Sequence, residues 1–126
     1  EREGEVAGEQ LSWLESELEK GRECRYIFIF LHRPLFSYLL QKKSHAQFAS
    51  EEKRNTLFSL FKKYKVSAVF AGHEHLYDSS MHDGLRQFIS GGGGGPFHFA
   101  PAFNHYLTVE VTDKNATVQP IIVTAE

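Results

Sequence analysis

The sequence is poor in several residue types and patterns, and each shortage excludes a class of protein. A single cysteine, Cys24, rules out an internal disulfide. There is no run of about 18 or more apolar residues, the length that a membrane helix needs; the densest apolar stretch, residues 26–31, has the length of a strand. The net charge of −2 creates no basic field that would attract nucleic acid or an anionic membrane. We therefore expect neither a nucleic-acid partner nor a membrane.

The bulk composition is that of one ordinary globular domain. The 126 residues suffice for a single core, and 41% apolar and 24% charged residues are typical fractions. Two features depart from the average: the chain has seven histidines, and residues 91–95 are all glycine. These two features direct the search for a functional site.

Two stretches have helical periodicity. In residues 10–20 the leucines fall on one stripe, and Gly21 suits the position that ends the helix. A second helix is expected to begin after Ser50, which is a suitable N-cap, and to carry its apolar stripe in residues 57–64. Residues 44–49 show no period and are expected to form a loop.

Two short apolar runs predict buried strands on either side of the second helix. Residues 26–31 are apolar at every position, which is typical of a strand covered on both faces in a parallel sheet. Residues 66–71 have the same character. Further strands are expected at residues 85–90, 106–112 and 116–123, the last two joined by a turn at residues 113–115, and Pro120 indicates that the final strand lies at an edge.

The order of strand, helix and strand brings three histidines to one place. Such a unit is almost always right-handed with parallel strands, which lie about 4.8 Å apart when they are neighbours. Residues just beyond the carboxyl ends of these strands then share one edge of the sheet, where open α/β sheets bind ligands. His32 follows the first strand directly, and His73 and His75 follow the second after Gly72. We expect the three imidazoles to converge there.

Converging imidazoles are typical of a metal site, since imidazole suits zinc, iron and manganese. On an extended segment, His73 and His75 would point to one face, and Glu74 would point away, either to solvent or to hold a ligand from behind. Gly72 would allow a sharp turn or a close backbone approach. For His32 taken alone, a hydrogen-bonded surface side chain is an equal alternative.

Four stretches together resemble the calcineurin-like metallophosphoesterase superfamily. Gly72-His73-Glu74-His75 is similar to its closing Gly-His-x-His motif, and residues 31–35 are similar to its preceding His-x-Pro motif. Residues 9–15 resemble the helix that members place before that strand, and residues 90–95 followed by Pro96 resemble the glycine-rich stretch of purple-acid-phosphatase-like branches. The resemblance covers essentially the whole chain, with its motifs in the right order.

The resemblance implies an α/β fold, namely the C-terminal half of a two-sheet αββα sandwich, with residues 1–126 as the C-terminal part of a single domain. It implies two metal ions (manganese, iron or zinc), with His32 and His73 on one ion and His75 on the other. The superfamily's earlier motifs, which supply a bridging aspartate, an asparagine and a catalytic histidine, have no counterpart here. The only aspartates are Asp78, Asp83 and Asp113. Truncation explains this best, because the remaining motifs are intact and the chain begins at Glu1.

The function that the resemblance implies is metal-dependent hydrolysis of a phosphomonoester or phosphodiester. Two ions polarise the phosphoryl group, generate hydroxide and stabilise the leaving oxygen. A fragment with part of the site is expected to be inactive alone, and no catalytic residue is assigned in it. Arg33, Gly92 and Gly93 are candidates for contacting the substrate, although a structural ion pair is the favoured interpretation for Arg33 and a flexible loop is an equal alternative for the glycines.

Two alternatives remain open. The chain could be a non-catalytic module that binds a metal or a partner, or a zinc hydrolase of another class, for which Glu74 would be the only base near the histidines. Besides the phosphate-ester substrate, the expected partner is the missing N-terminal half or a second copy of the chain, because half a sandwich leaves an apolar face uncovered. The remaining aromatic and histidine residues are expected to pack or line a pocket (Phe97, Phe99, Phe103, His98 and His105) or to lie on the surface (His45 and His82).

Overall fold

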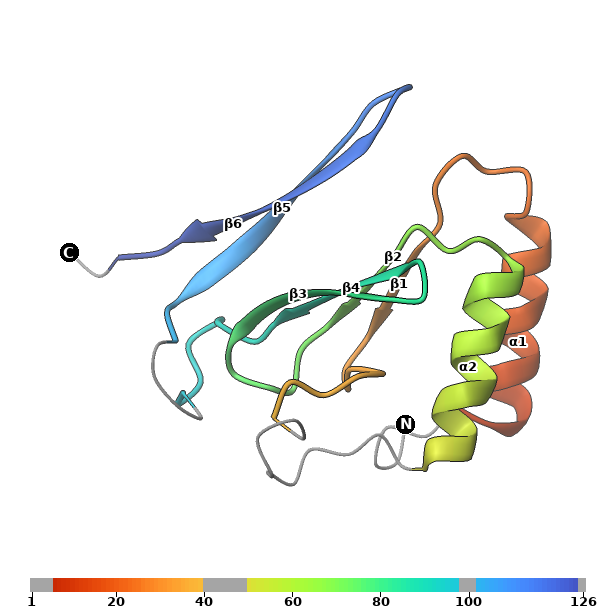
Figure 1. The fold of residues 1–126 in the computed structure, drawn as a ribbon, viewed down its shortest axis with the longest axis horizontal. Coiled ribbons are helices and arrows are strands. Elements are labelled where there is room, and N and C mark those ends of the chain that lie inside the picture. Colours follow the sequence, from red (N-terminus) through yellow and green to blue (C-terminus); the bar gives the residue numbers. More distant parts are fainter. Residues whose placement is uncertain (1–5, 40–49, 98–101, 125–126) are drawn as a thin grey trace.

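The structure, a computed structural model, describes residues 6–39, 50–97 and 102–124. Two helices cover one face of a four-stranded sheet, and a separate β-hairpin lies over its other face (Figure 1). The elements are α1 (Gly8–Lys20), β1 (Phe28–Leu31), α2 (Glu51–Lys63), β2 (Ala68–Ala71), β3 (Tyr77–His82), β4 (Leu85–Ser90), β5 (His105–Val111) and β6 (Ala116–Ile122).

Both predicted helices are present. The N-cap of α2 is confirmed: the Ser50 hydroxyl accepts a hydrogen bond from the Lys53 N–H at 3.1 Å. Helix α1 begins two residues before its predicted start and ends at Lys20, directly before Gly21. The predicted loop at residues 44–49 lies outside the described residues.

The four strands of the main sheet have the order β1-β2-β4-β3. Strands β1, β2 and β4 are parallel, whereas β3 runs antiparallel to β4. Strand β3 was missed by the sequence analysis because residues 77–82 are mostly polar and show no apolar alternation. A signal for it existed, since Asp83-Gly84 is a common two-residue hairpin turn, and both residues have positive φ angles, 45° and 85°.

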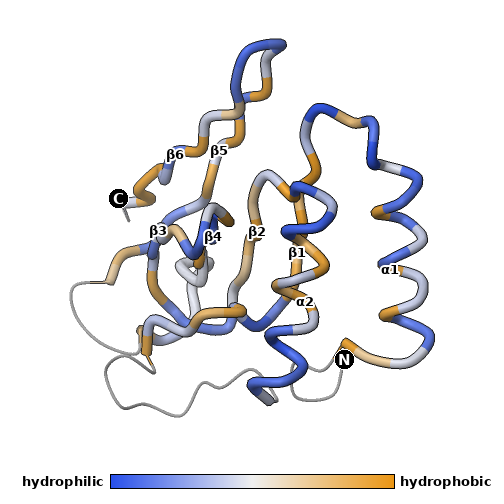
Figure 2. The backbone as a smooth tube through the Cα atoms, turned by 45° about the vertical axis from the view of Figure 1, so that its right-hand side comes forward, coloured by the Kyte–Doolittle hydropathy of each residue, from blue (hydrophilic) through white to orange (hydrophobic). Residues whose placement is uncertain are grey.

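The main core lies between the helices and the sheet. Leu57, Leu60 and Phe61 of α2 and Val69 of β2 are buried there, together with Leu18 of α1. Figure 2 shows hydrophobic residues recurring along the sides of the helices and through β1 and β2. This core fixes the two parallel strands whose carboxyl ends carry the histidines.

The opposite face of the sheet is only partly covered. Phe28, Phe70 and Phe88 lie in a second cluster, with Leu107 and Val118 of the hairpin packed against it. The hairpin leaves Phe30, in β1, 74% exposed, although its ring stacks on Phe70. Within the described residues, the second face of β1 is therefore covered only in part, although the sequence predicted a strand covered on both faces.

Strands β5 and β6 pair only with each other, antiparallel, as the second sheet. Pro120 pairs with Leu107 in this sheet, so the prediction that the last strand is an edge strand is confirmed. The mixed α/β architecture with two sheets is confirmed as well. Neither helix of the described ranges is long and apolar enough to cross a membrane.

Candidate metal centre

The parallel register of β1 and β2 brings His32 and His73 together. Leu31 and Ala71, the last residues of the two strands, are direct partners. Beyond them, the His32 carbonyl accepts a hydrogen bond from the Gly72 N–H at 3.0 Å, which extends the ladder by one step. The His32 Nε2 and His73 Nδ1 atoms are 3.1 Å apart, and the ring planes are inclined by 75°.

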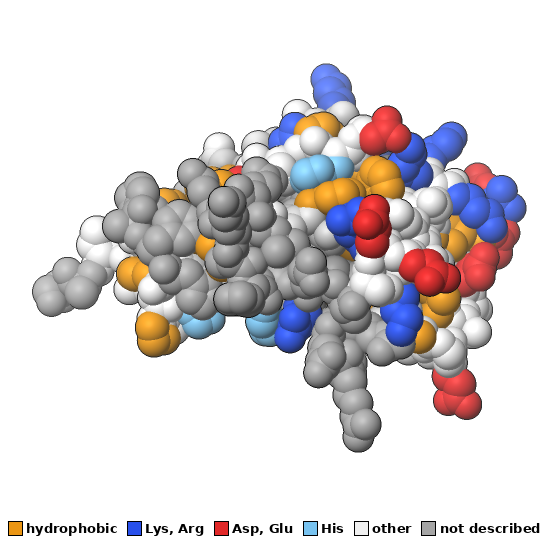
Figure 3. Space-filling model, turned by 60° about the horizontal axis from the view of Figure 1, so that its bottom comes forward, with side chains coloured by type: hydrophobic (Ala, Val, Ile, Leu, Met, Phe, Trp, Pro, Cys, Tyr) orange, Lys and Arg blue, Asp and Glu red, His pale blue; other side chains and the backbone are white. Residues whose placement is uncertain are grey.

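Figure 3 views the molecule from the side on which the carboxyl ends of these strands lie, and histidine side chains reach its surface there. His32 is exposed, and His73 and His75 are partly buried. An ion that approached this edge from solvent could therefore reach the imidazoles.

The Gly-His-Glu-His segment turns sharply, and the extended segment expected from the sequence is not formed. His73 has a positive φ of 63°. The N–H of Glu74 donates to the Gly72 carbonyl at 2.7 Å, and that of Leu76 donates to the Glu74 carbonyl at 2.8 Å. The simple alternation of side chains expected along this segment therefore does not apply, and each side chain must be placed by its own contacts.

His75 is held by the loop that follows β4. Its Nδ1 donates to the carbonyl oxygen of Pro96 at 2.5 Å. In a neutral ring this places the basic lone pair on Nε2, which is then the nitrogen suited to a metal. His73 therefore contacts His32, and His75 contacts Pro96.

Glu74 does not face solvent, so that alternative of the sequence analysis is wrong. The residue is 0% exposed, and its carboxylate accepts hydrogen bonds from the Ser37 hydroxyl and from the N–H groups of Tyr38 and Leu39. The reason is the sharp turn at His73, which directs the Glu74 side chain into the protein.

The glycine run makes close backbone approaches at three of its five positions. A Cβ atom on Gly91 would lie 2.0 Å from the Glu74 carbonyl oxygen, and one on Gly95 would lie 2.7 Å from the His75 ring. A Cβ on Gly92, which is buried, would lie 2.1 Å from His105 Nδ1, whereas Gly93 is exposed with open space around it. A side chain at any of these three glycines would therefore clash with its neighbours.

His105 and Phe103 pack beside the glycine loop. His105 is 4% exposed, its Nδ1 donates to the Phe103 carbonyl at 2.9 Å, and its Nε2 has no hydrogen-bond partner in the described structure. Phe97 is exposed, and His98, Phe99 and His45 lie outside the described residues.

The exposure of His82 and Arg33 can also be compared with the sequence predictions. His82 was expected on the surface, but it is only partly exposed, because its ring stacks on Phe36 with the centroids 3.8 Å apart. Arg33 is partly buried next to His32.

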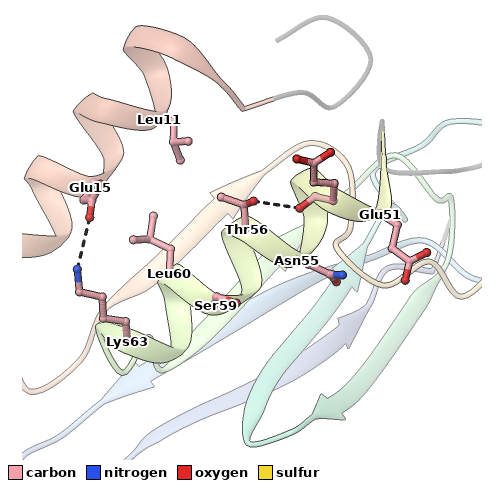
Figure 4. Close-up of a pocket in the computed structure, with 9 residues that line it drawn as sticks. Leu11, Glu15, Glu51, Asn55, Thr56, Ser59, Leu60 and Lys63 are labelled. Atoms are coloured by element: carbon pink, nitrogen blue, oxygen red, sulfur yellow. Dashed lines mark hydrogen bonds and ion pairs between the residues drawn. The ribbon is translucent and has the colours of Figure 1, made fainter.

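Two surface hollows differ in their relation to this edge. One, of about 590 Å³, is lined by His32 and Gly72 and by apolar residues of β1, β2 and β5, so the histidine edge continues into the apolar face under the hairpin. The other, of about 940 Å³, lies between α1 and α2, where Glu15 and Lys63 form an ion pair (Figure 4). The second contains none of the residues expected to bind a metal or substrate.

Comparison with known proteins gives two curated relatives. No family model matches the chain. Over 84 residues it is 32% identical to the serine/threonine-protein phosphatase CPPED1 of Danio rerio, a match that covers 65% of this chain and 27% of that protein. Over 73 residues it is 36% identical to the Fe(3+)-Zn(2+) purple acid phosphatase 12 of Arabidopsis thaliana, covering 56% of this chain and 15% of that protein. The chain is related to the calcineurin-like metallophosphoesterases.

Solved structures show the same fold. Purple acid phosphatase PPD1 from yellow lupin (Lupinus luteus) seeds superposes with a TM-score of 0.73 at 19% identity, covering 94% of this chain and 26% of that one. GAP50, the anchor in the inner membrane complex of Plasmodium, gives a TM-score of 0.68 at 15% identity, covering 86% of this chain and 36% of that one. The α/β fold is that of part of a metallophosphoesterase, and the chain spans less than a third of the length of either curated relative.

The imidazole pair has the geometry of two ligands on one metal ion. Two nitrogens each about 2.0–2.1 Å from an ion, at an angle of about 90–110°, lie roughly 2.8–3.4 Å apart. The 3.1 Å between the His32 and His73 nitrogens falls within this range, which also permits a direct hydrogen bond between the rings. The spacing of the pair therefore fits an ion as well as a direct hydrogen bond.

A complete metallophosphoesterase centre also needs a carboxylate, and the described residues do not provide one at this edge. Among them, no group of three or more histidine, cysteine, aspartate or glutamate side chains is placed to hold an ion. Asp83 pairs with Lys62, and Asp113 lies in the β5–β6 turn. Asp78, in β3, acts electrostatically on His82. The described residues therefore do not form a complete metal centre by themselves.

Two residues that support this edge were missed by the sequence analysis. Gln87 of β4 is 1% exposed and makes two hydrogen bonds to the backbone of Phe36. Gln87 gave a usable signal, because it is a polar residue on the same face of a predicted strand as Leu85 and Ile89. Ser37, which donates to Glu74, gave no such signal, because an isolated serine after a proline is common in any loop.

Proposed function

We propose that this chain contributes three metal ligands to a phosphoester hydrolase that acts on a phosphomonoester or phosphodiester. His32 and His73 bind one ion, and His75 binds the other. The observation that supports this most directly is the 3.1 Å separation of the His32 and His73 nitrogens at the shared carboxyl edge of β1 and β2. The phosphatase relatives support the reaction class in this proposal.

The protein groups have separable tasks in this proposal. The bound ions would polarise the phosphoryl group and supply hydroxide. The Pro96 carbonyl fixes the tautomer of His75, and the glycine loop lets the backbone pass close to its ring. Arg33, beside His32, is the candidate for a charged contact with phosphate, and the backbone at Gly92 and Gly93 is the candidate for a neutral one. The carboxylate of the centre comes from residues outside those described.

Metal-dependent turnover tests this function. The intact protein that contains this chain should hydrolyse p-nitrophenyl phosphate with added Mn²⁺, and His32→Ala should reduce the rate at least tenfold. An exposed residue of similar polarity away from the edge, Asn55 of α2, gives the control Asn55→Ala, which should retain activity. Turnover that is unaffected by chelation or by His32→Ala would contradict the proposal.

The isolated chain is expected to be inactive in the same assay. Three neutral imidazoles lack the carboxylate that bridges two ions and helps to form the hydroxide. Substantial Mn²⁺-dependent turnover by the pure 126-residue chain would show that it contains a complete centre.

We also propose that the apolar face beside β1 is covered by the rest of a longer polypeptide. Phe30 is 74% exposed there, and the chain spans only 27% and 15% of its curated relatives, so most of a relative's length lies elsewhere. The isolated chain should then self-associate in analytical ultracentrifugation as its concentration rises, and Phe30→Ser should weaken this association. A monodisperse isolated chain at high concentration would contradict the proposal.

A further inference from the structure

Glu74 is a buried carboxylate whose hydrogen bonds are all directed at one neighbouring segment. The residue is 0% exposed and lies between His73 and His75 in the chain. One of its oxygens accepts from the Ser37 hydroxyl, and the other accepts from the N–H groups of Tyr38 and Leu39 at 3.0 and 3.3 Å. A buried carboxyl group is costly without hydrogen-bond partners, and these three donors supply them.

The segment that Glu74 holds is the one that begins at His32. From His32 the chain runs through Pro34 to residues 36–39, where it is fixed to the sheet twice. Gln87 of β4 bonds both backbone groups of Phe36, at 3.1 and 2.8 Å, and Glu74 bonds the next three residues. The backbone of Glu74 is continuous with His73. A single side chain thus links the two segments that carry His32 and His73.

We propose that Glu74 is a positioning residue: its carboxylate, by holding residues 37–39, sets the separation of the His32 and His73 nitrogens for metal binding. The inference rests on the proposed function, because it takes these two histidines to bind an ion. Groups that orient metal ligands without contacting the metal themselves typically change the metal affinity about 10–100-fold when they are replaced. Glu74→Gln keeps the side-chain volume, but its amide NH₂ faces a donor, so at least one hydrogen bond is lost.

The affinity for Co²⁺, followed by its visible absorption, measures this effect in the intact protein. Glu74→Gln should weaken Co²⁺ binding at least tenfold and alter the shape of the absorption band, because the ligand geometry changes. The matched control is Glu52→Gln, the same chemical change on the exposed surface of α2, which should leave both unchanged. Amide hydrogen exchange at Tyr38 and Leu39, measured without metal, should be faster in Glu74→Gln.

The outcomes separate this inference from the function on which it rests. If the wild-type protein binds no Co²⁺, the proposed function fails and the inference fails with it. If the wild type binds Co²⁺ and Glu74→Gln binds it equally well with the same spectrum, only the inference fails, even if the variant is less stable. If Glu74→Gln does not fold, Ser37→Ala removes one donor and keeps the carboxylate. It should then weaken Co²⁺ binding in the same direction by a smaller factor, and unchanged binding would overturn the inference.

Discussion

Replacing Gly91 by alanine tests the close packing of the glycine loop against the Gly-His-Glu-His segment. A Cβ at this position would lie 2.0 Å from the Glu74 carbonyl oxygen and 2.9 Å from the His75 Cα, whereas real Cβ contacts are essentially never under 3.0 Å. The two backbones would have to separate by about 1 Å, the difference between 3.0 and 2.0 Å. Overpacking usually costs about 1–3 kcal/mol, and we expect the upper part of this range because a backbone atom cannot rotate away.

The measurement is equilibrium urea unfolding of the wild type, Gly91→Ala and the control Gly93→Ala. The control adds the same methyl group to the same loop, but nothing lies within 4 Å of its Cβ, so its free energy of unfolding should change by no more than about 0.5 kcal/mol. Because the clash involves the backbone between two histidines, Gly91→Ala should also weaken metal binding. Equal stability of the two variants would show that the loop does not lie against Glu74 as described.

Three further predictions concern stability. Ser50→Ala should lower the free energy of unfolding by about 1 kcal/mol, because the Lys53 N–H loses its acceptor; an unchanged urea midpoint would exclude the cap. Phe61→Ala should cost about 3–5 kcal/mol, since this side chain is buried between α2 and the sheet, and a loss below about 1 kcal/mol would contradict that packing. Burial lowers the pKa of His82 below its usual 6.5, so the unfolded chain binds this proton at a higher pH than the folded chain does. Stability should therefore fall as the pH drops below about 6.5, and His82→Gln should reduce that fall in thermal melts at several pH values; an identical pH dependence would refute this.

The elements of the fold that were predictable are those with a local signal. The stripe and N-cap of α2 and the apolar run of β2 depend on neighbouring residues only, and both elements are present where they were expected. Strand β3 forms because β4 offers it a partner, so its polar sequence did not indicate a strand. The exposure of Phe30 depends on how far a distant hairpin reaches, which no local pattern contains.

The candidate site was predictable in its location and less so in its details. Strand order and parallel direction suffice to bring His32 and His73 to one edge, and the structure places their nitrogens 3.1 Å apart. The direction of Glu74 was not predictable, because the alternation rule holds only for extended backbone and the chain turns at His73. The contact of His75 with Pro96 depends on a glycine loop whose path the sequence does not specify.

The positive φ angle of His73 affects the choice of substitutions in any study of this site. An L-residue other than glycine in the left-handed region costs about 1–2 kcal/mol, and asparagine tolerates that region better than most residues do. Alanine at position 73 would therefore remove the imidazole and leave the backbone strained at its positive φ. Glycine would remove both the imidazole and the strain. Asparagine is the substitution that replaces the imidazole while disturbing the turn least. Kinetic comparisons of position 73 with position 32 should accordingly use His73→Asn, so that a loss of metal is not confused with a rearranged loop.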